Sequence, residues 1–186
     1  MEWFPQLELG WFNGWILLTL YGVVFGLTIA LLPKEAVKRL YDRSGWSKQQ
    51  RTLTLIGKLL SLAGFILVIW TPLRLGSMVY GLGIALFVLG LAGVVIALLN
   101  FAHTPAGEPV TKGLYKISRN PQWVMLVITF LGICIAVGSW TAVLLMVAAT
   151  LFYHFRIRAE EAACLAQYGD SYRSYMNQVP RYFIFF

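Results

Sequence analysis

The residues of this chain that are best suited to chemistry lie in a short polar loop, residues 111–123, between two long apolar runs. Gly113 permits a close backbone approach, and Tyr115 and Trp123 offer aromatic faces on which a base can stack. Pro121 suits the first turn of a helix. A helix start favours a bound anion because its free N–H groups and its dipole are positive. The loop therefore predicts a site for a charged molecule with an aromatic part.

A second polar cluster, residues 156–161, follows the last apolar run. Arg156 and Glu160 are four residues apart, so on a helix they share one face. An ordinary juxtamembrane salt bridge would explain this pair on its own. Together with the loop, however, the pair suggests that Glu160 binds an ammonium group while the helix start near Asn120 binds a carboxylate. S-adenosylmethionine carries both groups and an aromatic base, although these features alone do not single it out.

The composition is typical of a membrane protein. Of the 186 residues, 59% are hydrophobic and 12% are charged, whereas soluble domains contain about 25% charged residues. A net charge of +7 would suggest nucleic acid in a soluble protein. Here the cations flank apolar runs, where anionic headgroups and membrane topology explain them better, so we expect no nucleic-acid partner. Cys134 and Cys164 lack the spacing of metal ligands, and we expect no metal.

Five apolar runs approach the length of about 20 residues that a membrane-spanning helix needs. The break at Gly138-Ser139 is short enough to make the last two runs a helical hairpin. Beyond the hairpin we expect the helix to continue to about Gln167, a tail helix at 172–178, and a final segment, 181–186, on the membrane surface. The predicted spans are Trp11–Leu32, Thr52–Thr71, Met78–Leu99, Gln122–Val137 and Trp140–Phe155.

The predicted fold class is therefore an all-α polytopic membrane protein with five transmembrane helices. Residues 1–186 form a single membrane domain with an N-terminal three-helix region, residues 1–99, and a cofactor-binding region, residues 100–186. Lys and Arg are concentrated in segments 33–51 and 100–121 and in the tail. The positive-inside rule then places the N-terminus outside, the C-terminus in the cytoplasm and both polar clusters on the cytoplasmic face.

Small residues spaced four apart offer a further packing signal. Gly10 and Gly14, and likewise Gly22 and Gly26, have the GxxxG spacing that lets membrane helices approach closely.

The two polar clusters resemble the isoprenylcysteine carboxyl methyltransferase and phospholipid methyltransferase superfamily of integral membrane proteins. The resemblance covers residues 100–182 and is carried by Gly113-x-Tyr115, by Arg119-Asn-Pro-Gln-Trp123, by Glu160-Glu161 and by Tyr168-Gly-Asp170. The family's usual spelling of the second motif is Arg-His-Pro-x-Tyr, so this chain has Asn and Trp where His and Tyr are usual.

The resemblance implies an S-adenosylmethionine-dependent methyltransferase with a lipid-like or membrane-partitioned acceptor, surrounded by membrane lipids. By the same resemblance Arg156 is the catalytic residue that faces the acceptor. The implied cofactor contacts are Asn100, Glu108, Pro109, Val110, Tyr115, Asn120, Pro121, Gln122, Trp123 and Glu160.

The sequence is also compatible with two other classes of function. A membrane reductase of the sterol reductase type, which uses NADPH, has a C-terminal pattern similar to Val179-Pro180-Arg181 and Cys164. A non-catalytic membrane protein would give no reason for the two polar clusters. Binding of S-adenosylhomocysteine or of NADPH discriminates these alternatives.

Overall fold

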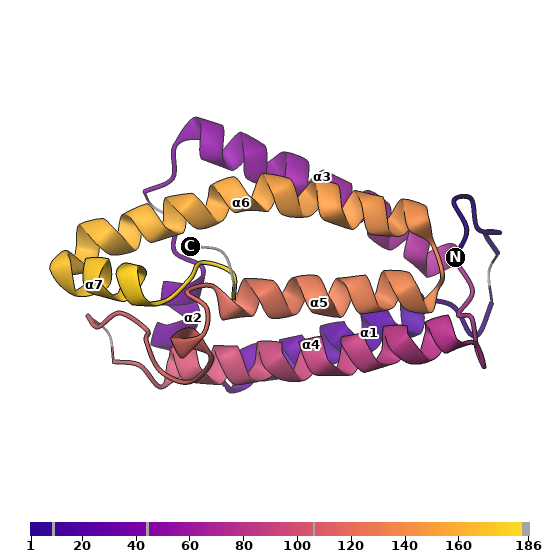
Figure 1. The fold of residues 1–186 in the computed structure, drawn as a ribbon, viewed down its shortest axis with the longest axis horizontal. Coiled ribbons are helices and arrows are strands. Elements are labelled where there is room, and N and C mark those ends of the chain that lie inside the picture. The colour runs from indigo at the N-terminus through magenta and orange to yellow at the C-terminus, as the bar shows by residue number, and fades with distance from the viewer. Residues whose placement is uncertain (9, 44, 106, 184–186) are drawn as a thin grey trace.

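The computed structural model describes residues 1–183 apart from residues 9, 44 and 106. These residues form an all-α structure, as predicted, and the long helices lie side by side along the long axis of the molecule (Figure 1). The elements are α1 (Trp15–Leu31), α2 (Lys34–Leu40), α3 (Lys48–Trp70), α4 (Met78–Ala102), the 3-10 turn η1 (Gly113–Lys116), α5 (Pro121–Ala136), α6 (Trp140–Tyr168) and α7 (Asp170–Gln178).

Helices α3, α4 and α6 are long and apolar enough to cross a membrane. Helices α1 and α5 are also apolar, but their 17 and 16 residues fall short of the roughly 20 that a straight span needs. The chain is therefore an integral membrane protein built of apolar helices, and the number of spans stays a prediction. The short helix α2, which begins directly after Pro33, was not predicted.

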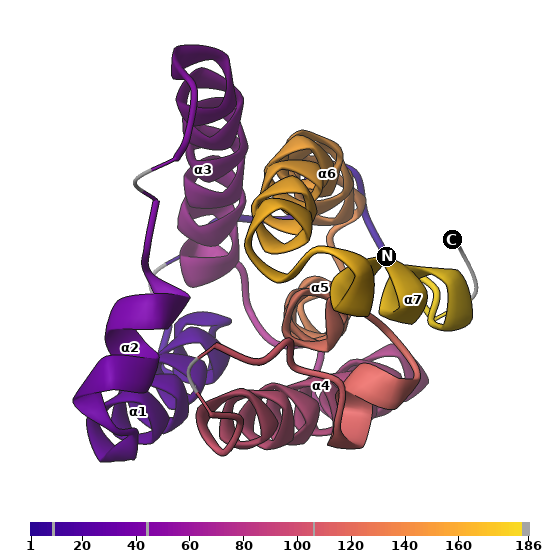
Figure 2. The ribbon, with the colours of Figure 1, turned by 90° about the vertical axis from the view of Figure 1, so that its left-hand side faces the viewer.

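Helix α5 lies between α4 and α6, and it packs most extensively against α4 (Figure 2). Glycines make this approach possible, because a Cβ at Gly83 or Gly132 would overlap the backbone of the facing helix. A side chain at Gly90 would meet Thr129 of α5 in the same way. By contrast, a Cβ at Gly22 would meet nothing within 4 Å, so in this chain that glycine permits no close helix contact.

The second large helix contact joins α3 to α6. Gly57 allows it, because a Cβ there would lie 3.3–3.4 Å from atoms of Phe152, Ala149 and Tyr153. The apolar core lies between the helix pairs and includes Val68, Phe87, Ile133 and Val137. The α4–α5 and α3–α6 contacts thus position the ends of α4, α5 and α6 relative to one another.

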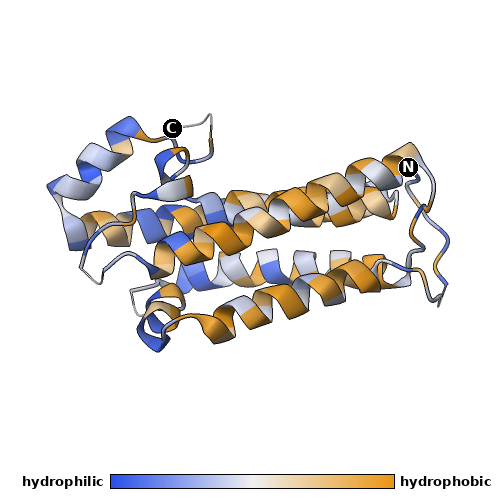
Figure 3. Ribbon diagram, turned by 90° about the horizontal axis from the view of Figure 1, so that it is seen from below, coloured by the Kyte–Doolittle hydropathy of each residue, from blue (hydrophilic) through white to orange (hydrophobic). Residues whose placement is uncertain are grey.

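One end of the bundle, the end that carries α7, is rich in hydrophilic residues (Figure 1 and Figure 3). Helix α6 reaches this end because it continues past Phe155, the last residue of its apolar run, to Tyr168. Gly169 then adopts a φ of 55°, which is favourable for glycine, and the chain turns directly into α7. The polar end therefore collects α2, η1, the start of α5, the end of α6 and α7 (Figure 1).

Candidate functional site

A cavity of about 850 Å³ opens at the polar end of the bundle. Its walls come from α2 and the segment after it, from Gln50 of α3 and Phe101 of α4, from residues 109–110, and from η1, α5, α6 and α7. Its volume falls within the range of roughly 300–1,000 Å³ that is usual for small-molecule sites. The structure thus brings the two predicted polar clusters together around one space. The predicted site residues that line it are Pro109, Val110, Tyr115, Asn120, Gln122, Trp123, Arg156 and Glu160.

Asn100, Glu108 and Pro121 do not line this cavity. The Oδ1 oxygen of Asn100 accepts a hydrogen bond of 3.0 Å from the backbone N–H of Leu114, and a Cβ at Gly113 would overlap the Asn100 side chain. Asn100 therefore shapes the η1 turn from α4. Glu108 is exposed, and Pro121 is fully buried as the first residue of α5.

Arg156 and Glu160 lie on one face of α6, as their spacing predicted. The Arg156 Nε atom lies 2.8 Å from Glu160 Oε1, and both side chains are partly exposed. The Arg156 guanidinium also lies 5.5 Å from the centre of the Trp46 ring, close enough for a cation–π contact. On the α5 side, the Trp123 ring packs edge-to-face against Tyr153 at 4.6 Å. Both aromatic contacts fix side chains that face the cavity.

Glu161, the neighbour of Glu160, is buried at the centre of a charged cluster that sequence reasoning missed. Its Oε1 atom lies 3.1 Å from Arg119 Nε and 2.9 Å from Asn120 Nδ2. Its Oε2 atom lies 2.9 Å from Arg181 Nε. A carboxylate with only 5% of its side chain exposed needs such partners, because a buried charge without them is costly.

The C-terminal segment is fastened to the polar loop. The backbone N–H of Arg119 donates to the backbone oxygen of Pro180 at 2.9 Å, and the Ser118 hydroxyl donates to the backbone oxygen of Arg181 at 2.8 Å. Tyr182 contacts His154 through its hydroxyl at 2.9 Å. Arg181 is therefore held by the buried Glu161 and Tyr182 by the half-buried His154, and the location of segment 181–186 on the membrane surface stays a prediction. Residues 184–186 lie outside the described residues.

Asn120 stands at the start of α5, as predicted, but its side chain does not cap the helix. Its backbone oxygen accepts hydrogen bonds of 3.1 Å from the backbone N–H groups of Trp123 and Val124. Its side-chain Nδ2 atom donates to Glu161. Next to it, Gln122 has a buried Nε2 atom without a hydrogen-bond partner. A buried donor without a partner is unfavourable, so Gln122 is suited to donate to a ligand in the cavity.

Arg39 closes the cavity from α2, and sequence reasoning gave it no role. Its guanidinium donates to the backbone oxygens of Phe101, Thr104 and Pro105 at 2.7, 3.2 and 3.2 Å, at and beyond the end of α4. Arg39 therefore ties α2 to α4. This contact explains how a helix of the N-terminal region becomes a wall of the cavity.

The tyrosines of the site are protonated at neutral pH. Burial raises the pKa of the Tyr115 and Tyr175 hydroxyls above the ordinary value. Tyr175 donates its proton to the backbone oxygen of Tyr115 at 2.6 Å, which joins α7 to η1. The hydrogen bond to Glu161 raises the pKa of Arg181, so that residue stays charged. Burial raises the pKa of Tyr182 to about 12.

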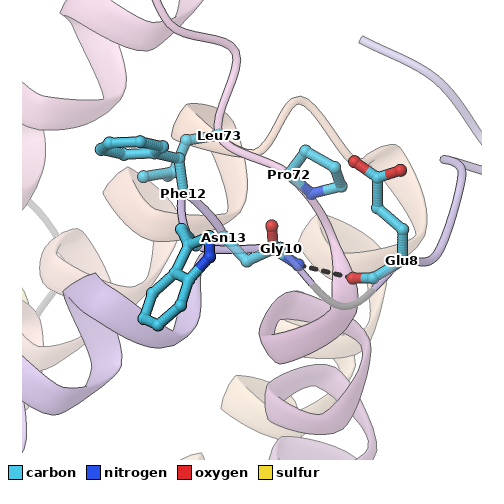
Figure 4. Close-up of a pocket in the computed structure, with 7 residues that line it drawn as sticks. Glu8, Gly10, Phe12, Asn13, Pro72 and Leu73 are labelled. Carbon is cyan, nitrogen blue, oxygen red and sulfur yellow. Dashed lines mark hydrogen bonds between the residues drawn. The ribbon is translucent and has the colours of Figure 1, made fainter.

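A second hollow, of about 530 Å³, lies at the opposite end of the bundle (Figure 4). Asn13 lies within it and donates to the backbone oxygen of Glu8 at 2.6 Å. Among the residues that line this hollow, the titratable one is Glu8. No group of three potential metal ligands occurs at either end among the residues that the structure describes.

Comparisons with known proteins agree with the resemblance of the polar clusters. A stretch of 88 residues is 33% identical to the protein-S-isoprenylcysteine O-methyltransferase of Schizosaccharomyces pombe, and it covers 44% of this chain and 37% of that protein. Residues 53–171, which run from α3 to α7, match the phospholipid methyltransferase family. The chain belongs to the phospholipid methyltransferase family.

Proposed function

We propose that this protein is an integral membrane methyltransferase that uses S-adenosylmethionine and methylates a lipid-like acceptor. The observation that carries the proposal is the cavity at the polar end. There, in a chain of a methyltransferase family, aromatic rings, a carboxylate and a helix start surround one space of a suitable size.

The residues around the cavity match the groups of the methyl donor. Glu160 is a partly exposed carboxylate that suits an ammonium group, and the start of α5 suits a carboxylate. Tyr115 and Trp123 suit the base, and the unpartnered Gln122 Nε2 atom supplies a donor. We extend the cofactor role to Pro109, Val110 and Asn120 along the same wall, and to Asn100, Glu108 and Pro121 as residues that shape it.

When bound, S-adenosylmethionine would supply a methyl group on a positively charged sulfur. A nucleophilic atom of the acceptor would bond to the methyl carbon as the carbon–sulfur bond breaks, and S-adenosylhomocysteine would leave. The chain's contribution is to hold the two reactants in register and to exclude water. Arg156 orients an anionic group of the acceptor, and its bond to Glu160 keeps the two roles on one face of α6. The acceptor reaches the cavity from the bilayer.

We propose that residues 1–186 act as one membrane domain. The C-terminal region, residues 100–186, supplies most of the donor site, and the N-terminal region, residues 1–99, supplies α2 and the segment after it as a further wall. The topology follows from the cations, which concentrate at the polar end. With five spans, the N-terminus lies outside, and the site and the C-terminus face the cytoplasm.

The direct test is to measure cofactor binding by the purified protein in lipid nanodiscs with isothermal titration calorimetry. We expect S-adenosylhomocysteine to bind and NADPH to show no saturable binding. NADPH binding without S-adenosylhomocysteine binding would favour a membrane reductase, and binding of neither would favour a non-catalytic protein.

A further inference from the structure

We propose that Glu161 is a positioning residue that acts through Asn120, and that Asn120 accepts a hydrogen bond from the methyl donor. This inference rests on the proposed function and adds a specific chemical role to two residues of its site. It begins from the position of Glu161, which is buried while it lies beside the cavity.

Side chains of the protein occupy all the acceptor positions of the Glu161 carboxylate. An ionised carboxylate offers about four acceptor positions and no donor. Arg119 and Asn120 use Oε1, at 3.1 and 2.9 Å, and Oε2 lies 2.9 and 2.8 Å from the Nε and Nη2 atoms of Arg181. The two arginines keep Glu161 ionised. Glu161 therefore has no acceptor position left for a ligand.

This cluster determines which way the Asn120 amide faces. Because Glu161 Oε1 can only accept, the Nδ2 group of Asn120 must face it, and the Oδ1 oxygen must point away. Asn120 lines the cavity, and within the described residues its Oδ1 oxygen has no hydrogen-bond partner. The amide thus presents an acceptor to the ligand, next to the donor that Gln122 presents.

The opposite orientation is disfavoured by charge. If Oδ1 faced Glu161, two acceptor oxygens would stand about 3 Å apart without a proton between them. The chemistry required of a ligand follows directly: it must offer an N–H or O–H group to Asn120. The amine of an adenine, an ammonium group and a ribose hydroxyl all meet this requirement, and the methyl donor carries each of them.

The test is a reciprocal exchange of the two polar groups, with S-adenosylhomocysteine affinity measured by calorimetry in nanodiscs. Asn120→Asp places a carboxylate against Glu161, and we expect at least about tenfold weaker binding. Adding Glu161→Gln to that variant removes the repulsion between the two carboxylates at the wild-type net charge and gives the introduced aspartate a donor. Part of the lost affinity should return, because the new amide donor also faces Arg119. Asn177→Asp, the same change at an exposed position outside the cavity, should bind like wild type.

Thermal unfolding without ligand shows whether each variant is folded. If the aspartate variant does not fold, Asn120→Leu replaces it, since leucine removes the acceptor without adding charge and should also weaken binding about tenfold. Wild-type affinity in either single variant, or no recovery in the double variant, overturns the inference while the proposed function stands. A wild-type protein that binds no S-adenosylhomocysteine overturns both.

Discussion

Glu160 and Glu161 are adjacent in the sequence, yet their surroundings differ. The Glu160 side chain is 39% exposed and pairs with Arg156, whereas the Glu161 side chain is 5% exposed and bonds to three residues of two separate segments. Consecutive residues of an α-helix are about 100° apart around its axis. One glutamate therefore faces the open cavity, and the other faces the seam between the polar loop and the C-terminal segment.

Replacing Glu160 should separate donor binding from acceptor binding. We expect Glu160→Gln to weaken S-adenosylhomocysteine binding by roughly 1.5–3 kcal/mol, the worth of a charge-assisted hydrogen bond. Arg156→Ala should lower turnover while donor affinity stays near wild type, if Arg156 orients the acceptor as we propose. Calorimetry and a methyl-transfer assay on both variants measure the two effects. Equal losses of donor affinity in the two folded variants would contradict this division of roles.

Only the local contacts of this site could be predicted at the residue scale. The Arg156–Glu160 pair was predicted because it spans one helical turn. The partners of Glu161 could not be found in this way, since Arg119 is 42 residues before it and Arg181 is 20 residues after it. The Glu160-Glu161 doublet was a signal, but it does not reveal which glutamate is buried.

At the scale of elements, α7 and the C-terminal segment hold the η1 turn and the start of α5 in place. Arg119 Nη1 donates to the backbone oxygens of Met176 and Val179 at 2.6 and 2.8 Å, near and beyond the end of α7. Tyr175 reaches the backbone of Tyr115 in η1. The seam thus combines these hydrogen bonds to backbone with the side-chain bonds of Glu161 to Arg119 and Arg181.

Removing one of these side-chain donors should loosen the seam. Tyr175→Phe leaves the Tyr115 carbonyl without its buried donor, and we expect a loss of about 1–3 kcal/mol in the free energy of unfolding. Tyr80→Phe is the matched control, because the Tyr80 hydroxyl has no hydrogen bond within the described residues. Denaturant or thermal unfolding in detergent measures both. Equal stabilities of the two variants would show that the Tyr175 hydroxyl contributes nothing.

The contact between α4 and α5 offers a second test at this scale. Gly132→Ala puts a Cβ into the backbone of Phe87, and we expect about 1–3 kcal/mol of destabilisation from overpacking. Gly22→Ala on α1 is the control, because open space surrounds that position and alanine favours a helix. If both variants unfold at the wild-type temperature, the close approach of α4 and α5 does not limit stability.

The element scale also shows what the sequence pattern could and could not predict. The five apolar helices could be predicted from the sequence, because a long apolar run is typical of a helix that is buried in lipid or in the protein core. The GxxxG spacing was only partly informative. Gly14 does permit a close contact, since a Cβ there would overlap Val68 and Val137, whereas open space surrounds Gly22 and Gly26. The glycines of the α4–α5 contact, such as Gly83 and Gly132, were not chosen from the spacing. Helix α2 was missed because it has only 7 residues, several of them charged, and it directly follows a proline.

At the scale of the whole molecule, the charge distribution and the cavity share one end of the bundle. The opposite end holds the N-terminal segment and Arg74, which pairs with Glu2. A membrane would place the polar end and the opposite end in different aqueous phases. From the positive-inside rule we predict that the polar end faces the cytoplasm.

Cysteine labelling in intact cells tests this orientation. With Cys164 replaced by serine, we expect Lys112→Cys to react only after the membrane is permeabilised and Ser77→Cys to react beforehand, because the two positions lie on opposite sides. Cys134 is buried and should not interfere. Labelling of both engineered cysteines from the same side would contradict the topology.

The central claim is that the cavity binds a methyl donor and delivers its methyl group to an acceptor from the membrane. The most direct measurement is the transfer of a labelled methyl group from S-adenosylmethionine into the lipid fraction by wild-type protein in nanodiscs, with Glu160→Gln beside it. Phospholipids and a prenylated cysteine are supplied as acceptors. We predict that label enters the lipid fraction with wild type and falls at least about tenfold with the variant at limiting donor. Label that never leaves the donor, or that transfers equally well with both proteins, would contradict the claim.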